Sequence, residues 1–274
     1  MELPDIDIIS EIYNSKKYSS IYQPFLERVC NEESVKYKKN KEIIKAVKNR
    51  LHTVYGAFFF DNSVKLADDL INNINNNNDE EIFLDSMSEK LMNLNTSSRE
   101  RLSFIKELYK FIYDNIAHKN INTILDIGCG FNPFSLPFIC ESFKNIKSYY
   151  AFDIDVNLAK IINKYFDLFN FPQYAGCIDI ISETPAQKAD IAFLFKIIPT
   201  VENCKKGRGF EIINNLDAKY IIVSFPTKTL CGKNIGMAKN YAASFEENLD
   251  CEKFAVIGKE IFANELVYVL GRNA

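Results

Sequence analysis

From about residue 121 onward, apolar residues gather in short runs that polar and turn-forming residues separate. The first five runs are almost wholly apolar, as in parallel strands buried on both faces, and helical segments lie between several of them. The last two runs follow each other closely and require antiparallel pairing at one edge of the sheet. The pattern predicts a mainly parallel α/β sheet. Its seven expected strands cover residues 122–128, 148–155, 173–180, 189–196, 220–226, 254–260 and 264–271.

The first hundred residues have a different pattern. Apolar side chains recur at helical spacing, for example at Ile43, Val47 and Leu51, and this spacing predicts amphipathic helices. Because the spacing of apolar residues changes from helical to strand-like near the first expected strand, we predict two domains. A helical N-terminal domain covers residues 1–105, and an α/β domain covers residues 106–274.

Two local signals refine this helical region. The asparagine-rich tract over residues 71–81 would propagate a helix poorly, so we expect a loop there. In the segment 95–102, a Thr or Ser stands ahead of Glu100 and an apolar run. That arrangement is typical of a helix start, and we expect the Thr or Ser to be the N-cap.

Composition limits the class of protein. The chain has 274 residues and 47% hydrophobic content but no apolar stretch near twenty residues, so we expect no membrane span. Its first ten residues lack the basic segment and apolar core of a secretory signal. The seven cysteines are scattered and include no Cys-x-x-Cys pair, which favours reduced thiols over disulfides or a zinc site. We therefore expect a soluble, cytoplasmic protein without a metal.

The charge is unevenly distributed. A net charge of −3 argues against a surface that binds polyanions everywhere. Residues 36–50 nevertheless contain seven basic residues and a single acid. This basic segment is either a solvated helix face or a surface that contacts phosphates. Its basic residues are Lys36, Lys38, Lys39, Lys41, Lys45, Lys48 and Arg50.

Acidic residues end three successive expected strands, at Asp126, Asp153 and Asp179. In a doubly wound sheet, ligands bind where the carboxyl ends of the strands meet. Asp153 lies where a carboxylate accepts ribose hydroxyls, and Asp179 is a candidate acceptor for the amine of an adenine ring. We expect no arginine beside these acids to hold a 2′-phosphate. Each acid alone could be a turn or cap residue, but together they favour a nucleoside ligand.

The turn after the first strand contains Gly128 and Gly130, which let the backbone turn tightly and approach a ligand. Pro133 replaces the third glycine of the dinucleotide fingerprint and removes an amide that a pyrophosphate would need. S-adenosylmethionine has no phosphate and fits this turn better. Arg101 is either a partner for its carboxylate or an exposed helix charge. Asn132 is either a helix N-cap or a contact to the target base.

Longer motifs carry a resemblance to a known family. The G-C-G-F-N-P turn and the S-F-P-x-K-[ST]-L-x-G-K segment are the most specific of them. The chain resembles the Arm/Rmt family of aminoglycoside-resistance 16S rRNA methyltransferases, which modify N7 of the guanine at position 1405. The similar segments cover residues 15–18, 50–58, 97–102, 124–138, 151–155, 193–202, 223–237, 240–246 and 264–270.

The resemblance implies a class I, Rossmann-like methyltransferase with a seven-stranded, mainly parallel sheet and an N-terminal rRNA-docking domain. The cofactor-binding residues that it implies are Arg101, Asp126, Gly128, Gly130, Asp153, Asp179 and Phe195. The implied target-base pocket comprises Phe195, Lys196, Ser224, Phe225 and Pro226. The implied rRNA contacts outside the basic segment are Lys228, Lys233, Met237 and Asn240.

The resemblance also implies the reaction: a monomer transfers a methyl group from S-adenosylmethionine to guanine 1405 near helix 44 of the 30S subunit. The result would be resistance to 4,6-disubstituted deoxystreptamine aminoglycosides such as gentamicin and kanamycin. Guanine N7 has a free lone pair and loses no proton, so we expect no general base. Two alternatives stay open: a methyltransferase for small molecules and a non-catalytic RNA-binding protein. The missing third glycine disfavours a dehydrogenase.

Overall fold

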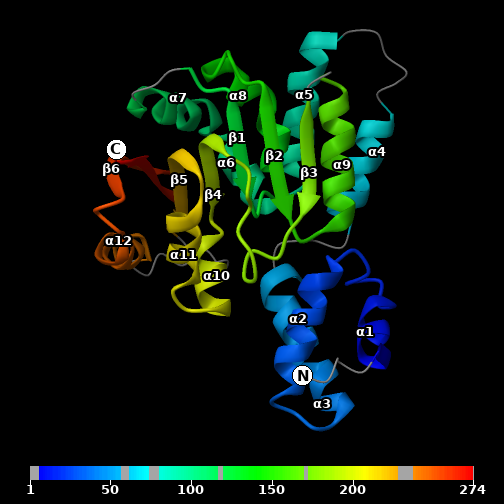
Figure 1. The fold of residues 1–274 in the computed structure, drawn as a ribbon. Coiled ribbons are helices and arrows are strands. Elements are labelled where there is room, and N and C mark those ends of the chain that lie inside the picture. The colour runs from blue at the N-terminus through cyan, green and yellow to red at the C-terminus, as the bar shows by residue number, and fades with distance from the viewer. Residues whose placement is uncertain are drawn as a thin grey trace.

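A seven-stranded sheet forms the centre of the molecule (Figure 1). The computed structural model describes residues 6–56, 62–73, 80–116, 120–169, 172–227 and 237–273. The strand order is β3-β2-β1-β4-β5-β7-β6; the β5–β7 and β7–β6 pairs are antiparallel, and the other four pairs are parallel. This arrangement confirms the predicted fold class. The strands are β1 (Thr123–Ile127), β2 (Ser148–Asp153), β3 (Gln173–Cys177), β4 (Ala189–Phe195), β5 (Ala218–Pro226), β6 (Phe254–Phe262) and β7 (Glu265–Arg272).

Helices cover both faces of the sheet because the buried strands are apolar on both sides. On β1, Ile124 packs into one hydrophobic core and its neighbour Leu125 into the other. No helix among the described residues has the length and apolar character to cross a bilayer. One core includes α4 (Ser63–Asn72), α5 (Glu80–Asn93), α7 (Ile105–Asn115), α8 (Leu136–Ser142) and α9 (Val156–Asp167). The other includes α10 (Ile198–Cys204), α11 (Arg208–Asn215) and α12 (Met237–Asn248).

The first three helices form a unit with its own hydrophobic core, which we call the N-terminal unit. It consists of α1 (Ile6–Tyr13), α2 (Gln23–Ser34), α3 (Asn40–Leu51) and a π-helix, η1 (His52–Gly56). The stripe predicted at Ile43, Val47 and Leu51 is buried in this core, as expected. The unit lies beyond the carboxyl ends of the strands (Figure 1). By contrast, α4 and α5 pack with the sheet, and the domain boundary near residue 105 stays a prediction.

The helix predicted to begin near residue 95 is α6 (Thr96–Leu102), but its cap differs from our expectation. The N-cap is Asn95, whose side chain accepts a hydrogen bond from the Ser97 amide at 3.0 Å. Thr or Ser as the cap was therefore wrong, because Asn caps a helix equally well and stands one position earlier. Both ends of the predicted asparagine-rich loop, residues 71–72 and 80–81, are helical instead, since α4 ends at Asn72 and α5 begins at Glu80. Residues 74–79 lie outside the described residues.

One buried carboxylate joins the N-terminal unit to the sheet. Asp155 is 1% exposed and follows β2. Its Oδ1 accepts the Leu158 amide at 2.8 Å and so caps α9. Its Oδ2 accepts the hydroxyls of Ser20, at 3.0 Å, and of Tyr55. Beside it, the Tyr22 amide donates to the Ile154 carbonyl at 2.8 Å. The N-terminal unit is thus fixed directly above the edge where the strands end.

Replacing Asp155 should show how much its two roles, as the cap of α9 and as the acceptor for the N-terminal unit, contribute to stability. Asp155→Ala removes a helix cap and leaves two hydroxyls of the N-terminal unit without their acceptor. We expect the free energy of unfolding to fall by about 2–4 kcal/mol, measured by urea denaturation. Asp167→Ala, at the exposed end of the same helix, is the control and should change it by less than about 0.5 kcal/mol. Equal stability of the two variants would contradict this role for Asp155.

Candidate functional site

A pocket opens at the carboxyl ends of β1 to β4, beneath the N-terminal unit. It encloses about 1020 Å³, including its open mouth, which is at the upper end of the range for small-molecule sites. Six of the seven predicted cofactor residues line it: Arg101, Gly128, Gly130, Asp153, Asp179 and Phe195. The predicted residues therefore lie around one pocket, although they are spread over 95 positions of the chain, from 101 to 195.

Asp153 presents a carboxylate to the pocket from the end of β2. Its Oδ2 accepts the Gly130 amide at 2.9 Å, and its Oδ1 accepts the Ile154 amide at 2.7 Å. Burial raises the pKa of Asp153 to about 6, and the nearby charge of Asp155 adds to this effect while the backbone amides oppose it. The carboxylate is therefore ionised at neutral pH and becomes protonated as the pH falls through about 6.

The two positions of the turn require glycine for partly different reasons. Both have a positive φ, +61° at Gly128 and +49° at Gly130, which favours glycine at each position. A Cβ at Gly128 would lie 2.7 Å from the side chain of Ile197, so this glycine permits close packing. A Cβ at Gly130 would meet no atom within 4 Å. The backbone at Gly130 is thus open to a ligand in the pocket.

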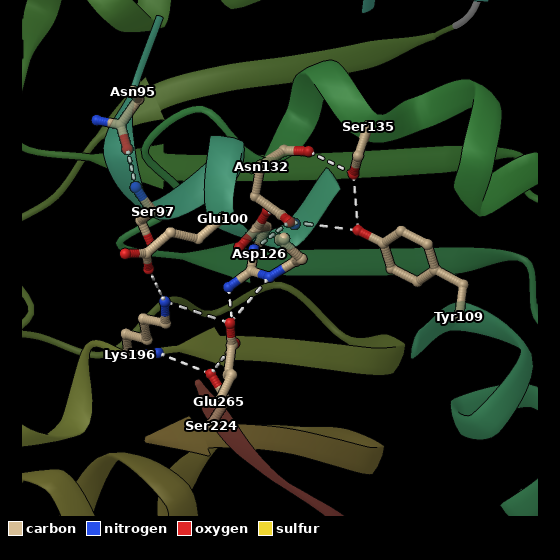
Figure 2. A network of polar contacts seen from close by, with 11 residues as sticks. Asn95, Ser97, Glu100, Tyr109, Asp126, Asn132, Ser135, Lys196, Ser224 and Glu265 are labelled. Carbon is tan, nitrogen blue, oxygen red and sulfur yellow. Dashed lines mark hydrogen bonds and ion pairs between the residues drawn. The ribbon is translucent and has the colours of Figure 1, made fainter. Parts of the chain in front are cut away.

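Asp126 does not line the pocket but lies behind it. Asp126 is 1% exposed, and its carboxylate accepts a hydrogen bond from Tyr149 Oη at 2.7 Å. It also accepts one from Asn132 Nδ2 at 2.8 Å (Figure 2). Burial raises the pKa of Asp126 to about 6, although these hydrogen bonds oppose the shift. Asn132 lies between Asp126 and the pocket. Its side chain lines the pocket, and Asp126 holds it in place.

Asn132 begins a short 3₁₀-helix, η3 (Asn132–Ser135), but does not cap it, so the N-cap alternative was wrong. Its side chain is turned instead into a buried polar network. Besides the bond to Asp126, its Oδ1 accepts Arg101 Nη1 at 2.9 Å and Tyr109 Oη at 3.2 Å. The Tyr109 hydroxyl in turn lies 2.7 Å from Ser135 Oγ (Figure 2). The side-chain amide of Asn132 thus links the carboxylate of Asp126 to the guanidinium of Arg101.

Arg101 is a buried pocket residue and not an exposed helix charge, since it is only 2% exposed. Its guanidinium donates to both carboxylate oxygens of Glu265, through Nη2 at 2.8 Å and Nε at 3.3 Å. It also lies 4.3 Å from the centre of the Phe195 ring. With the bond to Asn132, these contacts use three of its five N–H donors among the described residues. The other two N–H donors have no hydrogen bond to a described residue.

Glu265, at the start of β7, is fully buried and binds several site residues at once. Besides Arg101, it accepts the Ser224 hydroxyl at 2.5 Å and lies 3.4 Å from Lys196 Nζ (Figure 2). Burial alone would raise the pKa of Glu265, but the charges of Arg101 and Lys196 hold it below its usual value. A single carboxylate therefore orients residues that we predicted for the cofactor and for the target base.

Lys196 has an unusual backbone for a non-glycine residue. Its φ is +57°, in the left-handed region, where such strain often occurs at functional sites. The conformation is held by its amide, which donates to the Ser224 carbonyl at 3.1 Å. The ammonium also pairs with Glu100 at 3.2 Å. The chain thus turns sharply after β4 and aims Lys196 into the pocket.

The predicted target-base residues divide between the pocket and the core. Phe195 and Lys196 line the pocket. Ser224 and Phe225 point to opposite faces of the sheet, because neighbours on a strand alternate. Phe225 is 3% exposed and stacks on Tyr241 of α12 at 5.2 Å between ring centroids. It therefore lies in the core beneath α12, while Pro226 is partly exposed at the end of β5.

Asp179 has an arginine as its partner, contrary to our expectation. Arg28 of α2 donates to Asp179 Oδ2 through Nε at 2.5 Å and to Oδ1 through Nη2 at 3.2 Å. The two residues are 151 positions apart in the sequence, so spacing could not reveal the pair. The N-terminal unit also contributes Phe25 and Val54 to the pocket lining.

The basic segment is partly neutralised by acids. Four of its seven basic residues take part in ion pairs, with partners on three helices or their flanks: Lys36 with Glu33, Lys39 with Glu42, Lys48 with Glu11, and Arg50 with Glu32 and Glu33. The other three, Lys38, Lys41 and Lys45, are exposed, and none forms an ion pair with a described residue. These three are the strongest candidates in the segment for contacts to phosphate.

Two of the other predicted rRNA contacts, Met237 and Asn240, belong to α12. Asn240 is exposed on this helix, and Met237 is its first residue. Lys228 and Lys233 lie outside the described residues.

Sequence reasoning missed Arg28 and gave no role to Glu265. The one signal for Glu265 was an acid at the start of a strand that is otherwise apolar, and it looked like an ordinary turn residue.

Comparisons with known proteins agree on one group. The model of a family described as ribosomal RNA methyltransferase (FmrO) matches residues 14–269. Two curated proteins, from Serratia marcescens and Proteus mirabilis, are both named 16S rRNA (guanine(1405)-N(7))-methyltransferase. Each is 29% identical to this chain over 97% of its length, and the match covers 98% and 96% of the two relatives.

The chain is also similar to solved structures of 16S rRNA methyltransferases. The 16S rRNA methyltransferase RmtF, in complex with S-adenosyl-L-homocysteine, superposes with a TM-score of 0.86 at 28% identity, and the match covers 100% of both chains. The 16S rRNA methylase RmtB superposes with a TM-score of 0.81, also at 28% identity, over 97% of this chain and 98% of its own. The similarity therefore includes the N-terminal unit as well as the sheet.

Glu265→Gln should show how strongly the site depends on this carboxylate. The amide keeps the shape of the side chain but leaves Arg101 buried without an anion. We expect the free energy of unfolding to fall by about 3–5 kcal/mol, measured by urea denaturation. Glu260→Gln, on the exposed side of β6, is the matched control.

The double variant Arg101→Met with Glu265→Gln should recover part of this loss, because it removes the unpaired buried cation. If Glu265→Gln alone were as stable as the Glu260→Gln control, the ion pair would not hold the site together.

Proposed function

The chain belongs to the ribosomal RNA methyltransferase (FmrO) family, and from this premise we propose that it methylates N7 of guanine 1405 in 16S rRNA. The observation that carries the proposal is the match, over nearly the whole chain, to relatives named for this reaction. Family membership confirms the resemblance inferred from the motifs. It also confirms a methyltransferase and, with the complex of RmtF, the predicted cofactor S-adenosylmethionine.

The pocket residues fit this cofactor, which supplies an electrophilic methyl group on a sulfonium when bound. Asp153 offers a buried, ionised carboxylate for the two ribose hydroxyls, as a nucleoside site requires. Arg101 offers its two remaining N–H donors to the carboxylate of the methionine end. Gly130 leaves space for the ligand beside the turn. We assign Asp179 to the amine of the adenine ring.

The chain's own contribution to the reaction is alignment. Guanine N7 carries a free lone pair, so no residue needs to remove a proton. The reacting atoms must instead be held in line at roughly 3 Å. We propose that Phe195 and Lys196, at the pocket, and Ser224 and Pro226, at the end of β5, border the target base. Ion pairing to Glu265 fixes the Lys196 side chain for that purpose.

We further propose that the substrate is the 30S subunit, in the region of helix 44. The N-terminal unit, with exposed Lys38, Lys41 and Lys45, would contact phosphates, and Asn240 on α12 would contribute from the other side of the pocket. A base inside a helix must be flipped out to react, at a cost of a few kcal/mol. Methylation at this position would confer resistance to gentamicin- and kanamycin-type aminoglycosides.

The reaction and its target can be tested together. Labelled methyl transfer from S-adenosylmethionine would be measured on 30S subunits, 70S ribosomes and naked 16S rRNA, followed by borohydride and aniline cleavage at N7-methylguanine. We expect label on 30S subunits and one cleavage, at position 1405. Label at another nucleotide would overturn the target, and label on no RNA would favour a small-molecule substrate.

The raised pKa of Asp153 gives the cofactor site a pH dependence. Ribose hydroxyls donate to the ionised carboxylate, and a pKa of about 6 means that this form is lost as the pH falls. We expect the affinity for S-adenosyl-L-homocysteine to drop about tenfold between pH 7 and pH 5, measured by calorimetry. Asp153→Ala should bind weakly at both pH values, so near-native affinity in this variant would refute the placement of the ribose.

Asp126 is the control for this pH dependence, because its pKa is also raised to about 6 by burial. Asp126→Asn should keep the loss of affinity at low pH if Asp153 is responsible. A flat profile in Asp126→Asn would assign the effect to Asp126 instead.

A further inference from the structure

We infer that Arg28 of the N-terminal unit is a positioning residue of the cofactor site, where it holds the carboxylate of Asp179 against the adenine ring. This inference rests on the proposed placement of adenine at Asp179. It adds to the cofactor site a residue that lies outside the α/β fold. It also makes the affinity for the cofactor depend on the helices that we propose to dock on rRNA.

The contact has the geometry of a strong ion pair. Arg28 binds both oxygens of Asp179, with Nε at 2.5 Å and Nη2 at 3.2 Å. The side chains are 16% and 4% exposed, respectively, so solvent screens this pair much less than a surface pair. A bidentate pair fixes the plane of the carboxylate as well as its position. The orientation of Asp179 is therefore set by α2.

The hydrogen bonds of Asp179 show how adenine could join this arrangement. Each carboxylate oxygen has about two acceptor positions. Oδ1 accepts Arg28 and the Ile181 amide at 3.1 Å, while Oδ2 accepts Arg28 and the Ser182 hydroxyl at 3.0 Å. Of these donors, the Ser182 hydroxyl can turn to solvent most easily, because Ser182 is exposed. The adenine amine would take its place on Oδ2 while Arg28 stays bound.

Arg28 is itself held on several sides. Its Nη1 donates to Glu32 Oε1 at 2.8 Å, one turn later on α2. Its guanidinium lies 5.2 Å from the centre of the Phe25 ring, and Phe25 is 2% exposed and lines the pocket. The same face of α2 thus provides an apolar wall and a fixed cation. These contacts distinguish a preorganised residue from a surface arginine that meets Asp179 by chance.

The acids around Arg28 connect it to the basic segment. Glu32 pairs with both Arg28 and Arg50, and Arg50 also reaches Glu33 at 3.0 Å. Arg50 belongs to the residues that we predicted to contact rRNA. A phosphate that drew Arg50 away would change the charge beside Arg28. Binding of rRNA and of cofactor would then be coupled, and by linkage each would change the affinity of the other.

The test compares Arg28→Met, Asp179→Asn and the double variant. Calorimetry would measure the dissociation constants of S-adenosyl-L-homocysteine and of its 6-oxo analogue, S-inosyl-L-homocysteine. The analogue has an acceptor where adenine has its amine, so the parent protein should discriminate against it. We expect Arg28→Met to weaken S-adenosyl-L-homocysteine about tenfold and to reduce this discrimination. The double variant should be little weaker than Asp179→Asn alone.

Two further variants separate positioning from general damage. Arg28→Lys keeps the charge but cannot bond both oxygens, so it should show an intermediate affinity and discrimination. Arg99→Met, an exposed arginine on α6, is the matched control and should bind like the parent. If Arg28→Met were to unfold, the discrimination ratio of a folded Arg28→Lys would decide the question.

The outcomes separate the role of Arg28 from the placement of adenine at Asp179, on which it rests. Parent-like affinity together with parent-like discrimination in Asp179→Asn would show that adenine does not bind there, because the amide of Asn could donate to the oxo group of the analogue, and the inference would fail with that placement. Weak binding in Asp179→Asn with parent-like affinity and discrimination in both Arg28 variants would leave the placement intact and refute the role of Arg28. Neither result depends on methyl transfer to guanine 1405, which the labelling experiment tests separately.

Discussion

The buried ion pair between Arg101 and Glu265 is the interaction on which the site depends. It joins a helix that precedes the sheet to a strand at its antiparallel edge. Through Glu265 it fixes Lys196 and Ser224, and through Asn132 it reaches Asp126 at the end of β1. A buried pair of this kind adds little to stability by itself, but losing one partner leaves a costly unpaired charge. The geometry of the pocket and the integrity of the fold are therefore maintained by the same contacts.

The rest of the site is arranged around this pair by the sheet. Parallel strands bring Asp153 and Asp179 to one edge, where the N-terminal unit closes over them. Asp155 and Asp179 bind side chains of that unit, from Tyr55 and Arg28, at two separate points. The unit is thus attached by buried carboxylates that belong to the ligand-binding edge. The helical unit that we propose to dock on rRNA is in this way also part of the small-molecule pocket.

Local patterns in the sequence were sufficient for the sheet, and six of the predicted cofactor residues lie around one pocket. Strands buried on both faces have a strong apolar signal, and the rule that ligands bind at their carboxyl ends located Asp153 and the glycine turn. The pairing of Arg28 with Asp179 could not be predicted, because it depends on how two units pack across 151 positions. The cap at Asn95 was missed because several polar residues compete at a helix start. Whether Asp126 faces the ligand or the core likewise depends on the rotation of a strand, which no spacing rule determines.

The position of β7 has a consequence for how the protein is made. This strand follows the other six strands of the sheet in sequence, yet it lies inside the sheet, between β5 and β6. While the ribosome is still synthesising residues before 265, β5 has an open edge, β6 has no partner, and Arg101 lacks its anion. Open edges of this kind invite pairing with other chains. Vectorial synthesis therefore delays completion of the sheet and its ligand pocket until β7 has emerged from the exit tunnel.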